Sequence, residues 1–376
     1  MSRDVVVTGY GLVSSLGEGV DAALDVLRGR GQPRLDETTF APYPVHPVGA
    51  VEFDRQIPKK SDQRQMEPWQ RLGVYAAGLA LDHAGAKDDA ALKSRMHLIV
   101  AAGGGERDYA VDGQILTRIR EAADPGVFLN ERLMSDVRPT LFLAQLSNLL
   151  AGNISIVHGV TGASRTFMGE ESAGVDALRI ARARIASGQN DIVLVGGSNN
   201  AERPDSLLVY AMGGFLWREA FRPVFERPDA GGGFVLGSGG AFVVLESREH
   251  ADARGARALA GLAAVASTRT RRAPGAVASS LRSLWREAGL ERPDLVISGA
   301  TGVAMPTSEE REALAELSRG VVPLATGDAL GHTIEMHAPA GVALAAAAIA
   351  RGEASEAAVT AIGHWRGEGV IRLTRA

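Results

Sequence analysis

The stretch TGASRTFMGEESAGVDALRIARARIA, Thr161–Ala186, predicts the end of a buried strand, a tight turn and then a helix. Four apolar residues recur at spacings of 3, 3 and 4, as one face of an α-helix does: Val175, Leu178, Ala181 and Ile185. Gly174 permits close packing near the helix start, and Gly188 is expected to end the helix. The helix N-terminus favours negative charge, and many enzymes place a thiol or hydroxyl nucleophile there. This chain has Glu170 and Glu171 instead.

The composition is that of an ordinary globular protein. The chain has 376 residues, 45% hydrophobic and 22% charged, which is enough for a large core in one or two domains. A formal net charge of −4 argues against nucleic acid as a partner. The absence of cysteine excludes disulfides, thiolate zinc sites and a cysteine nucleophile. The N-terminus lacks an apolar signal region and the apolar run Ala338–Ala350 is too short to span a bilayer, so we expect a cytoplasmic protein with no membrane partner.

Strands and helices are predicted to alternate along the chain, which indicates an α/β protein with largely parallel sheets. In the middle of the chain, Pro139–Ala151 is predicted to be an apolar helix and Ile154–Val157 a short strand. The polar segment Ser247–Ala256 follows a strand, and beyond it the alternation resumes. We therefore expect two similar α/β halves, residues 1–247 and 248–376.

Three side chains near possible sites leave more than one interpretation open. A serine hydrolase centred on Ser172 would need glycine at Glu170, and two acidic neighbours oppose ionisation of the hydroxyl. Glu171 could be a general acid or base, or could cap a helix or pair with a buried arginine in an inactive pocket. His332 could be a site residue or a hydrogen-bonded structural histidine. His337 lies five residues further on, and no nearby carboxylate pattern forms a metal site.

Motifs spread along the whole chain resemble those of the β-ketoacyl synthases of the thiolase superfamily. The matching segments are Val5–Gly17, Pro139–Ile156, Gly188–Asn200, Gly233–Glu246 and His250–Ala256. The resemblance implies a five-layered αβαβα fold made of two duplicated halves and working as a dimer. Members of this family condense acyl and malonyl groups carried on acyl carrier protein. They use a cysteine at a helix N-terminus, two histidines and a lysine, and the resemblance implies no cofactor.

The family's catalytic residues are largely replaced in this chain. Glu171 stands at the nucleophile position, Thr301 replaces the first histidine, and Gly327 replaces the lysine, whereas the second histidine is retained as His332. The family's gating loop, G-F-G-G, corresponds to Gly363, His364, Trp365 and Arg366. Without a thiolate there is no acyl-enzyme, so no independent synthase activity is expected.

This pattern is similar to the chain-length factor, the inactive partner of an active ketosynthase in fatty acid or polyketide elongation. The resemblance then implies a heterodimer in which this subunit shapes the acyl tunnel, with Asp108–Phe128 as the segment that sets tunnel length. Three basic residues could dock the acidic acyl carrier protein or form a solvated face: Lys59, Lys60 and Arg64. Two alternatives stay open. One is a malonyl-carrier-protein decarboxylase or other acyl-transfer enzyme using Glu171 and His332, and the other is a non-catalytic homodimer that binds an acyl chain.

Overall fold

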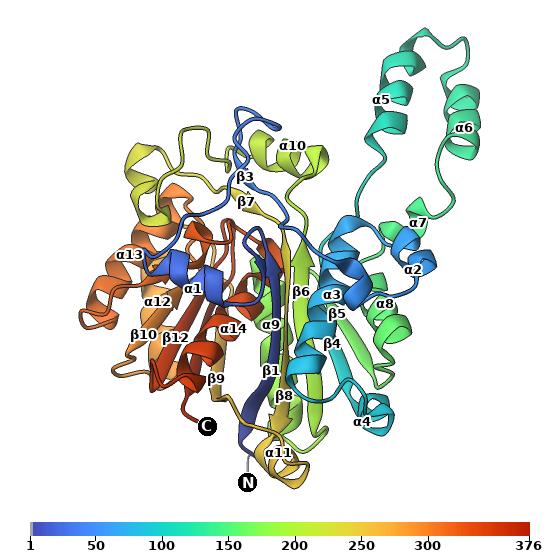
Figure 1. Ribbon diagram of the computed structural model, residues 1–376. Coiled ribbons are helices and arrows are strands. Elements are labelled where there is room, and N and C mark those ends of the chain that lie inside the picture. The colour runs from blue at the N-terminus through green and yellow to red at the C-terminus, as the bar shows by residue number, and fades with distance from the viewer. Residues whose placement is uncertain (1–2) are drawn as a thin grey trace.

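The computed structural model describes residues 3–376, and its central feature is one mixed β-sheet (Figure 1). β1 (Val5–Ser14) pairs antiparallel with β8 (Gly239–Ser247) on one side and with β9 (Ala260–Thr268) on the other. The remaining strands of the first half are β4 (His97–Ala101), β5 (Ser164–Phe167) and β6 (Ile192–Asn199). Those of the second half are β10 (Leu295–Ser298), β11 (Leu324–Ala325), β12 (Glu356–Ile362) and β13 (Glu368–Thr374). Short pairings involve β2 (Gly17–Glu18), β3 (Val45–His46) and β7 (Leu236–Gly237).

The two halves of the sheet have the same strand order. The first half runs β5-β4-β6-β8-β1 and the second runs β11-β10-β12-β13-β9. Numbered along the chain within each half, both orders are 3-2-4-5-1. In both halves the first three of these strands pair in parallel and the other pairings are antiparallel. The repeat confirms the predicted duplication, which no repeat in the sequence letters had revealed.

Helices lie on both faces of each half and between the halves. The central layer consists of α9 (Glu171–Ala186) and α14 (His337–Ala350), which contact strands of both halves and share with them the largest apolar cluster. The outer layer over the first half contains α3 (Pro68–His83) and α8 (Leu149–His158), and that over the second contains α12 (Ala276–Glu287) and α13 (Ala304–Leu317). This arrangement is the predicted five-layered αβαβα fold.

Smaller helices occupy the connections. They are α1 (Asp21–Leu27), α2 (Lys60–Gln65), α4 (Ala90–Arg95), α5 (Tyr109–Arg118), α6 (Pro125–Ser135), α7 (Leu141–Ala144), α10 (Pro204–Met212) and α11 (Arg248–Ala253). The hairpin formed by α5 and α6 stands clear of the body of the molecule (Figure 1). No helix among residues 3–376 is both long enough and apolar enough to cross a membrane. The sheet continues through β1 across the expected division at residue 247, and that division stays a prediction.

Three predictions about the middle of the chain were wrong. Ile154–Val157 belongs to the helix α8, and the predicted helix Pro139–Ala151 is broken into α7 and the start of α8. Burial explains the first error, because Leu150, Ala151, Ile154 and His158 are buried at helical spacing while Ile156 is 73% exposed. The strand before the central turn was predicted to be buried, but β5 is the edge strand of the sheet and its first residues are exposed.

The helix α9 follows its prediction closely. Its predicted apolar face is buried, and Gly188 ends the helix region with a φ of 78°. Gly174 is needed for packing, since a Cβ at that position would lie 2.6 Å from the backbone oxygen of Glu335. Close approach at this point brings the start of α9 against the segment that precedes α14, and this contact sets the position of the site described next.

Candidate functional site

The first residue of α9, Glu171, is held at the centre of a buried polar cluster. Its Oε1 lies 2.7 Å from Nε2 of His332 and 2.8 Å from Nδ1 of His364. The backbone N–H of His364 donates to the same oxygen at 3.2 Å. Glu171 and His332 are each 2% exposed. Glu171 therefore pairs with two histidines, whereas the structural interpretation of the sequence expected helix capping or a buried arginine.

His332 is positioned by the strand β7. The backbone N–H of His332 donates to the carbonyl of Val235 at 2.7 Å, and its carbonyl accepts from Gly237 at 3.0 Å. The preceding Gly331 has a φ of 71°, and a Cβ there would lie 2.7 Å from the ring of His46. The glycine is thus required both for the backbone conformation and for space.

His364 is positioned by the turn between β12 and β13. The N–H of Gly363 donates to the carbonyl of Gly367 at 2.8 Å, which closes the turn. The imidazole packs edge-on against Phe215 and Tyr210, with ring centroids 4.7 and 5.5 Å away. Trp365 in the same turn is exposed. The predicted gating-loop position, Gly363–Arg366, therefore covers the N-terminus of α9 and supplies one residue of the cluster, a role that the sequence did not reveal.

The charges in the cluster stabilise one another. Burial by itself raises the pKa of Glu171, but His364 and His332 outweigh this effect and leave that pKa well below its ordinary value. For His364, burial lowers the pKa, but the Glu171 carboxylate outweighs it and leaves the pKa raised. Glu171 is therefore an ionised carboxylate whose Oε1 accepts three hydrogen bonds, and it is a poor general acid.

Glu170 lies just outside this cluster in an unusual backbone conformation. Its φ of 57° and ψ of −135° are rare for a residue with a side chain. The Glu170 side chain is 39% exposed, and its Oε1 lies 3.8 Å from Nε2 of His364. The hydroxyl of Tyr210 donates to the same oxygen at 3.4 Å. The His364 ring thus lies between a buried carboxylate and a partly exposed one.

A second buried carboxyl, that of Glu335, borders a cavity beside the cluster. The cavity has a volume of about 400 Å³, and its lining includes Gly103, Asn199, Arg203, Tyr210 and Glu335. Burial, with the Glu171 carboxylate adding to it, raises the pKa of Glu335 to about 8. This carboxyl is consequently neutral at pH 7. Sequence reasoning missed Glu335 and Tyr210, because neither lies in a motif with a recognisable spacing.

The other predicted catalytic positions do not join the cluster. Thr301 is buried, and its hydroxyl accepts from the N–H of Val303 at 3.1 Å. Within residues 3–376, no hydrogen bond joins Thr301 to Glu171 or His332. At Gly327, a Cβ would lie 2.8 Å from Cγ2 of Val224, so the backbone leaves little room for a lysine there.

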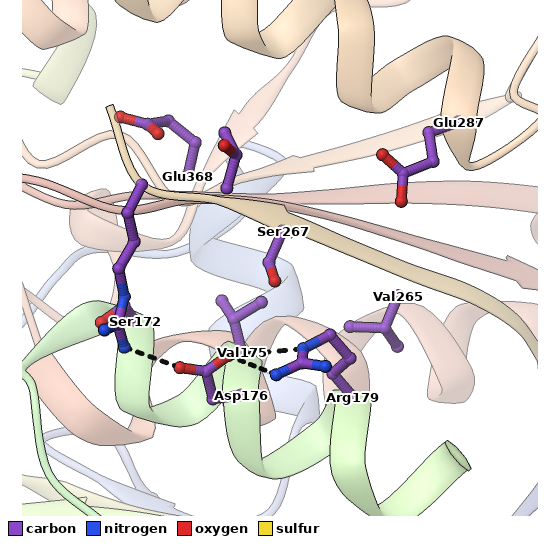
Figure 2. A pocket seen from close by; sticks show the side chains of 10 residues that line it. Ser172, Val175, Asp176, Arg179, Val265, Ser267, Glu287 and Glu368 are labelled. Atoms are coloured by element: carbon purple, nitrogen blue, oxygen red, sulfur yellow. Dashed lines mark hydrogen bonds and ion pairs between the residues drawn. The ribbon is translucent and has the colours of Figure 1, made fainter. Parts of the chain in front are cut away.

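Ser172 faces a different pocket, which Figure 2 shows from close by. Its hydroxyl donates to the carbonyl of Gly169 at 2.8 Å. The pocket measures about 460 Å³ and contains Asp176, which binds Arg179 at 3.2 Å and Arg269 at 2.8 Å (Figure 2). These ion pairs occupy Asp176, Arg179 and Arg269, and no base bonds to Ser172 among the described residues. The geometry agrees with the sequence argument against a serine hydrolase.

The predicted docking residues lie at the surface. Lys59, Lys60 and Arg64 are exposed at the start and along α2, and Lys60 binds Asp54 at 2.6 Å. The segment Asp108–Phe128 forms α5, a short connection and the start of α6, so it belongs to the projecting hairpin. Neither position tests the role expected from the resemblance.

The cluster also contains ligand atoms of the kind that bind metal ions. One atom each from Glu171, His332 and His364 lies within 4.8 Å of the other two, and all three residues are buried. The spacing of possible metal ligands along the sequence does not reveal this set, because His332 and His364 lie 161 and 193 residues after Glu171.

Comparisons with known proteins point to one family. The sequence model of the β-ketoacyl synthase N-terminal domain matches residues 2–251. A 3-oxoacyl-[acyl-carrier-protein] synthase 2 from Vibrio cholerae is 28% identical over 269 residues, which cover 68% of this chain and 60% of that protein. The actinorhodin polyketide putative β-ketoacyl synthase 2 of Streptomyces coelicolor is 28% identical over 329 residues, covering 83% and 76% respectively.

A solved structure shares the whole fold. The ishigamide ketosynthase/chain length factor superimposes with a TM-score of 0.79 at 22% sequence identity, covering 100% of both chains. This likeness supports the architecture, and the sequence match supports the family.

Proposed function

Because this chain belongs to the β-ketoacyl synthase family, we propose that it is a catalytically silent subunit that pairs with an active synthase and shapes its acyl tunnel. One observation carries the proposal: the carboxylate of Glu171 occupies the nucleophile position and accepts three hydrogen bonds through one oxygen. Three hydrogen bonds to one oxygen weaken this carboxylate as a nucleophile, and its negative charge would repel the carbonyl oxygen of an approaching thioester as that oxygen gains negative charge.

The surface of the first half supports pairing. The hairpin of α5 and α6 exposes apolar side chains to solvent, among them Leu116, which is 71% exposed, and Met134, which is 80% exposed. Phe142 on α7 and Ile156 on α8 are exposed as well, and β5 is an open edge of the sheet. Exposed apolar patches of this kind mark protein–protein contacts. The ishigamide protein, a ketosynthase/chain length factor by its description, has the same fold.

The position of the α5–α6 hairpin limits how this chain could contribute to the acyl tunnel of a partner synthase. Val111 and Ile115 of α5 are buried, whereas Leu116 on the same helix faces solvent. Because the hairpin stands away from the body of its own chain (Figure 1), residues 108–128 would reach a tunnel only across an interface. Substituting small residues for bulky ones in this segment should lengthen the products made by the complex of this chain with an active synthase. Leu116→Ala is the first substitution to test.

Co-expression tests the proposed pairing. This chain, carrying an affinity tag, is produced with an untagged β-ketoacyl synthase that has the catalytic cysteine and comes from the same organism. We expect a one-to-one complex on gel filtration, and its loss in the Leu116→Ser/Met134→Ser variant. Val322→Ser is the matched control, since Val322 is 76% exposed but lies outside the hairpin. A stable homodimer of this chain that does not bind the synthase would contradict the proposal.

Two further assays address the roles expected from the resemblance. Reversing the charges of Lys59 and Lys60, which are exposed at α2, should weaken binding of an acidic acyl carrier protein if this subunit takes part in docking. Incubation with malonyl-carrier protein tests the alternative enzyme. If this chain alone forms acetyl-carrier protein, and the Glu171→Gln variant does not, the chain is a decarboxylase and the proposal of a silent subunit is wrong.

A further inference from the structure

We propose that Glu171, His332 and His364 form a binding site for one divalent transition-metal ion, with Zn²⁺ as the natural probe. The inference goes beyond the proposed function and does not rest on it. One ligand atom from each residue lies within 4.8 Å of the other two. The atoms in direct contact are Oε1 of Glu171, Nε2 of His332 and Nδ1 of His364. Two imidazole nitrogens and one carboxylate oxygen are a ligand set that zinc and related ions accept in proteins.

Binding an ion would require the three ligand atoms to change their separations. The carboxylate oxygen lies 2.7 and 2.8 Å from the two nitrogens. Ligand atoms about 2.1 Å from a tetrahedral ion lie roughly 3.4 Å apart, so these two contacts would widen by about 0.6 Å. The ligand atoms of the two histidines, which lie within 4.8 Å of each other, would have to come to a similar separation. Each imidazole N–H that now faces Oε1 would give up its proton to solvent or carry it on its other nitrogen.

A carboxylate lies near the second ring nitrogen of His364, although beyond hydrogen-bond distance. Imidazole ligands commonly direct their second nitrogen toward a carboxylate, which fixes the ring and raises its basicity. Nε2 of His364 lies 3.8 Å from Oε1 of Glu170, and Tyr210 donates to that same oxygen. Glu170 is partly exposed, so an ion could reach the buried ligands along its side chain. The strained φ of Glu170 is explained if this carboxylate must point back toward the ring.

A bound ion would join three distant segments of the chain. Glu171 begins α9, His332 lies in the segment before α14, and His364 lies in the turn between β12 and β13. Coordination would fix that turn over the end of α9, and an ion that binds only the folded protein stabilises it. The role inferred is therefore structural: Glu171 remains unavailable for acyl transfer, in agreement with a silent subunit.

The test is a titration of the full-length, metal-stripped chain with CoCl₂ and with ZnCl₂. We expect visible d–d absorption bands that saturate at one Co²⁺ per chain, bleaching on addition of Zn²⁺, and a higher Tm with Zn²⁺ that EDTA reverses. His364→Ala should abolish the bands. Glu170→Gln keeps all three ligands and should weaken affinity about tenfold, as loss of an outer partner does.

The control is His83→Ala, which removes an exposed histidine that packs on Tyr10 outside the cluster. Its bands and affinity should equal those of the wild type. Circular dichroism verifies the fold of each variant, and Glu170→Gln keeps the test decisive if His364→Ala does not fold. The proposal would be overturned if the wild-type protein showed neither absorption bands with Co²⁺ nor a shift in Tm with Zn²⁺. It would also be overturned if the wild type, Glu170→Gln and a folded His364→Ala bound the ion with equal affinity. A failure to pair with a synthase would leave these readouts unchanged.

Discussion

Oε1 of Glu171 and Nδ1 of His364 lie 2.8 Å apart, which connects the first residue of α9 to the turn between β12 and β13. The residues are separated by 193 positions in sequence, and both are buried. The resemblance aligns Glu171 with the family's nucleophilic cysteine, and in this chain the residue is one side of a buried ion pair. The contact links two segments of the fold, and its effect on the free energy of unfolding and on the pH dependence of stability can be measured.

Removing the carboxylate should destabilise the protein. Glu171→Ala leaves His364 and His332 without their shared partner in a buried site, and we expect a loss of about 3 kcal/mol in the free energy of unfolding. Urea unfolding at pH 6 measures it. Ser172→Ala is the matched control, since it removes only the hydrogen bond to the carbonyl of Gly169 and should cost about 1 kcal/mol. Equal effects of the two substitutions would show that the pair contributes little.

The same ion pair predicts a defined dependence of stability on pH. The raised pKa of His364 contributes stability that is complete below its ordinary value of 6.5 and is lost as pH rises through the folded-state pKa. The lowered pKa of Glu171 contributes stability that is present above 4.5 and is lost as pH falls. Unfolding curves from pH 4 to pH 9 should show that His364→Gln costs most between these values. A cost that stays constant across the range would contradict the pairing.

Glu335 should destabilise the protein progressively as pH rises. Its pKa is raised from 4.5 to about 8, so the folded protein holds a proton that the unfolded chain releases. Stability is therefore lost between pH 4.5 and about 8. Glu335→Gln keeps the size of the side chain without ionisation and should gain a few kcal/mol over wild type by pH 8, with a smaller difference at pH 5. A pH-independent difference would mean that Glu335 titrates normally.

Two glycines on helices should respond in opposite directions to the same substitution. Gly174→Ala on α9 places a Cβ 2.6 Å from the backbone oxygen of Glu335 and should cost about 1–3 kcal/mol. Gly113→Ala on α5 meets no atom within 4 Å and should stabilise the protein by about 0.5–1 kcal/mol. Thermal unfolding of the two variants measures both effects. Similar changes in Tm would show that α9 is not held tightly against the segment before α14.

The fold could be predicted from sequence where the pattern was strong and local. The apolar spacing of α9 and the glycine at 188 gave that helix almost residue by residue, and the resemblance gave the layers. The prediction of a strand at Ile154–Val157 was wrong because it followed the β-branched residues, whereas burial in α8 follows helical spacing. The prediction of a buried strand before the turn failed because periodicity does not tell a central strand from an edge strand.

The site could be predicted only in part. Glu171 and His332 were found because each occupies a position in a recognised motif. His364 was placed in the rebuilt gating loop without a role, since nothing local shows that this turn folds over α9. Glu335 and Tyr210 lie in no motif, and only the tertiary fold brings the segment before α14 and the helix α10 to the same cavity. Contacts between residues that are far apart in sequence depend on the tertiary fold, which spacing along one chain does not encode.

The central claim, that this subunit does not carry acyl groups, is tested most directly by intact-protein mass spectrometry after incubation with acyl-carrier protein. The complex of this chain with a cysteine-bearing synthase is the sample, so that the partner provides the positive control. The account predicts an acyl adduct on the partner and an unchanged mass for this chain. An acyl adduct on this chain that disappears in Glu171→Gln would contradict the account.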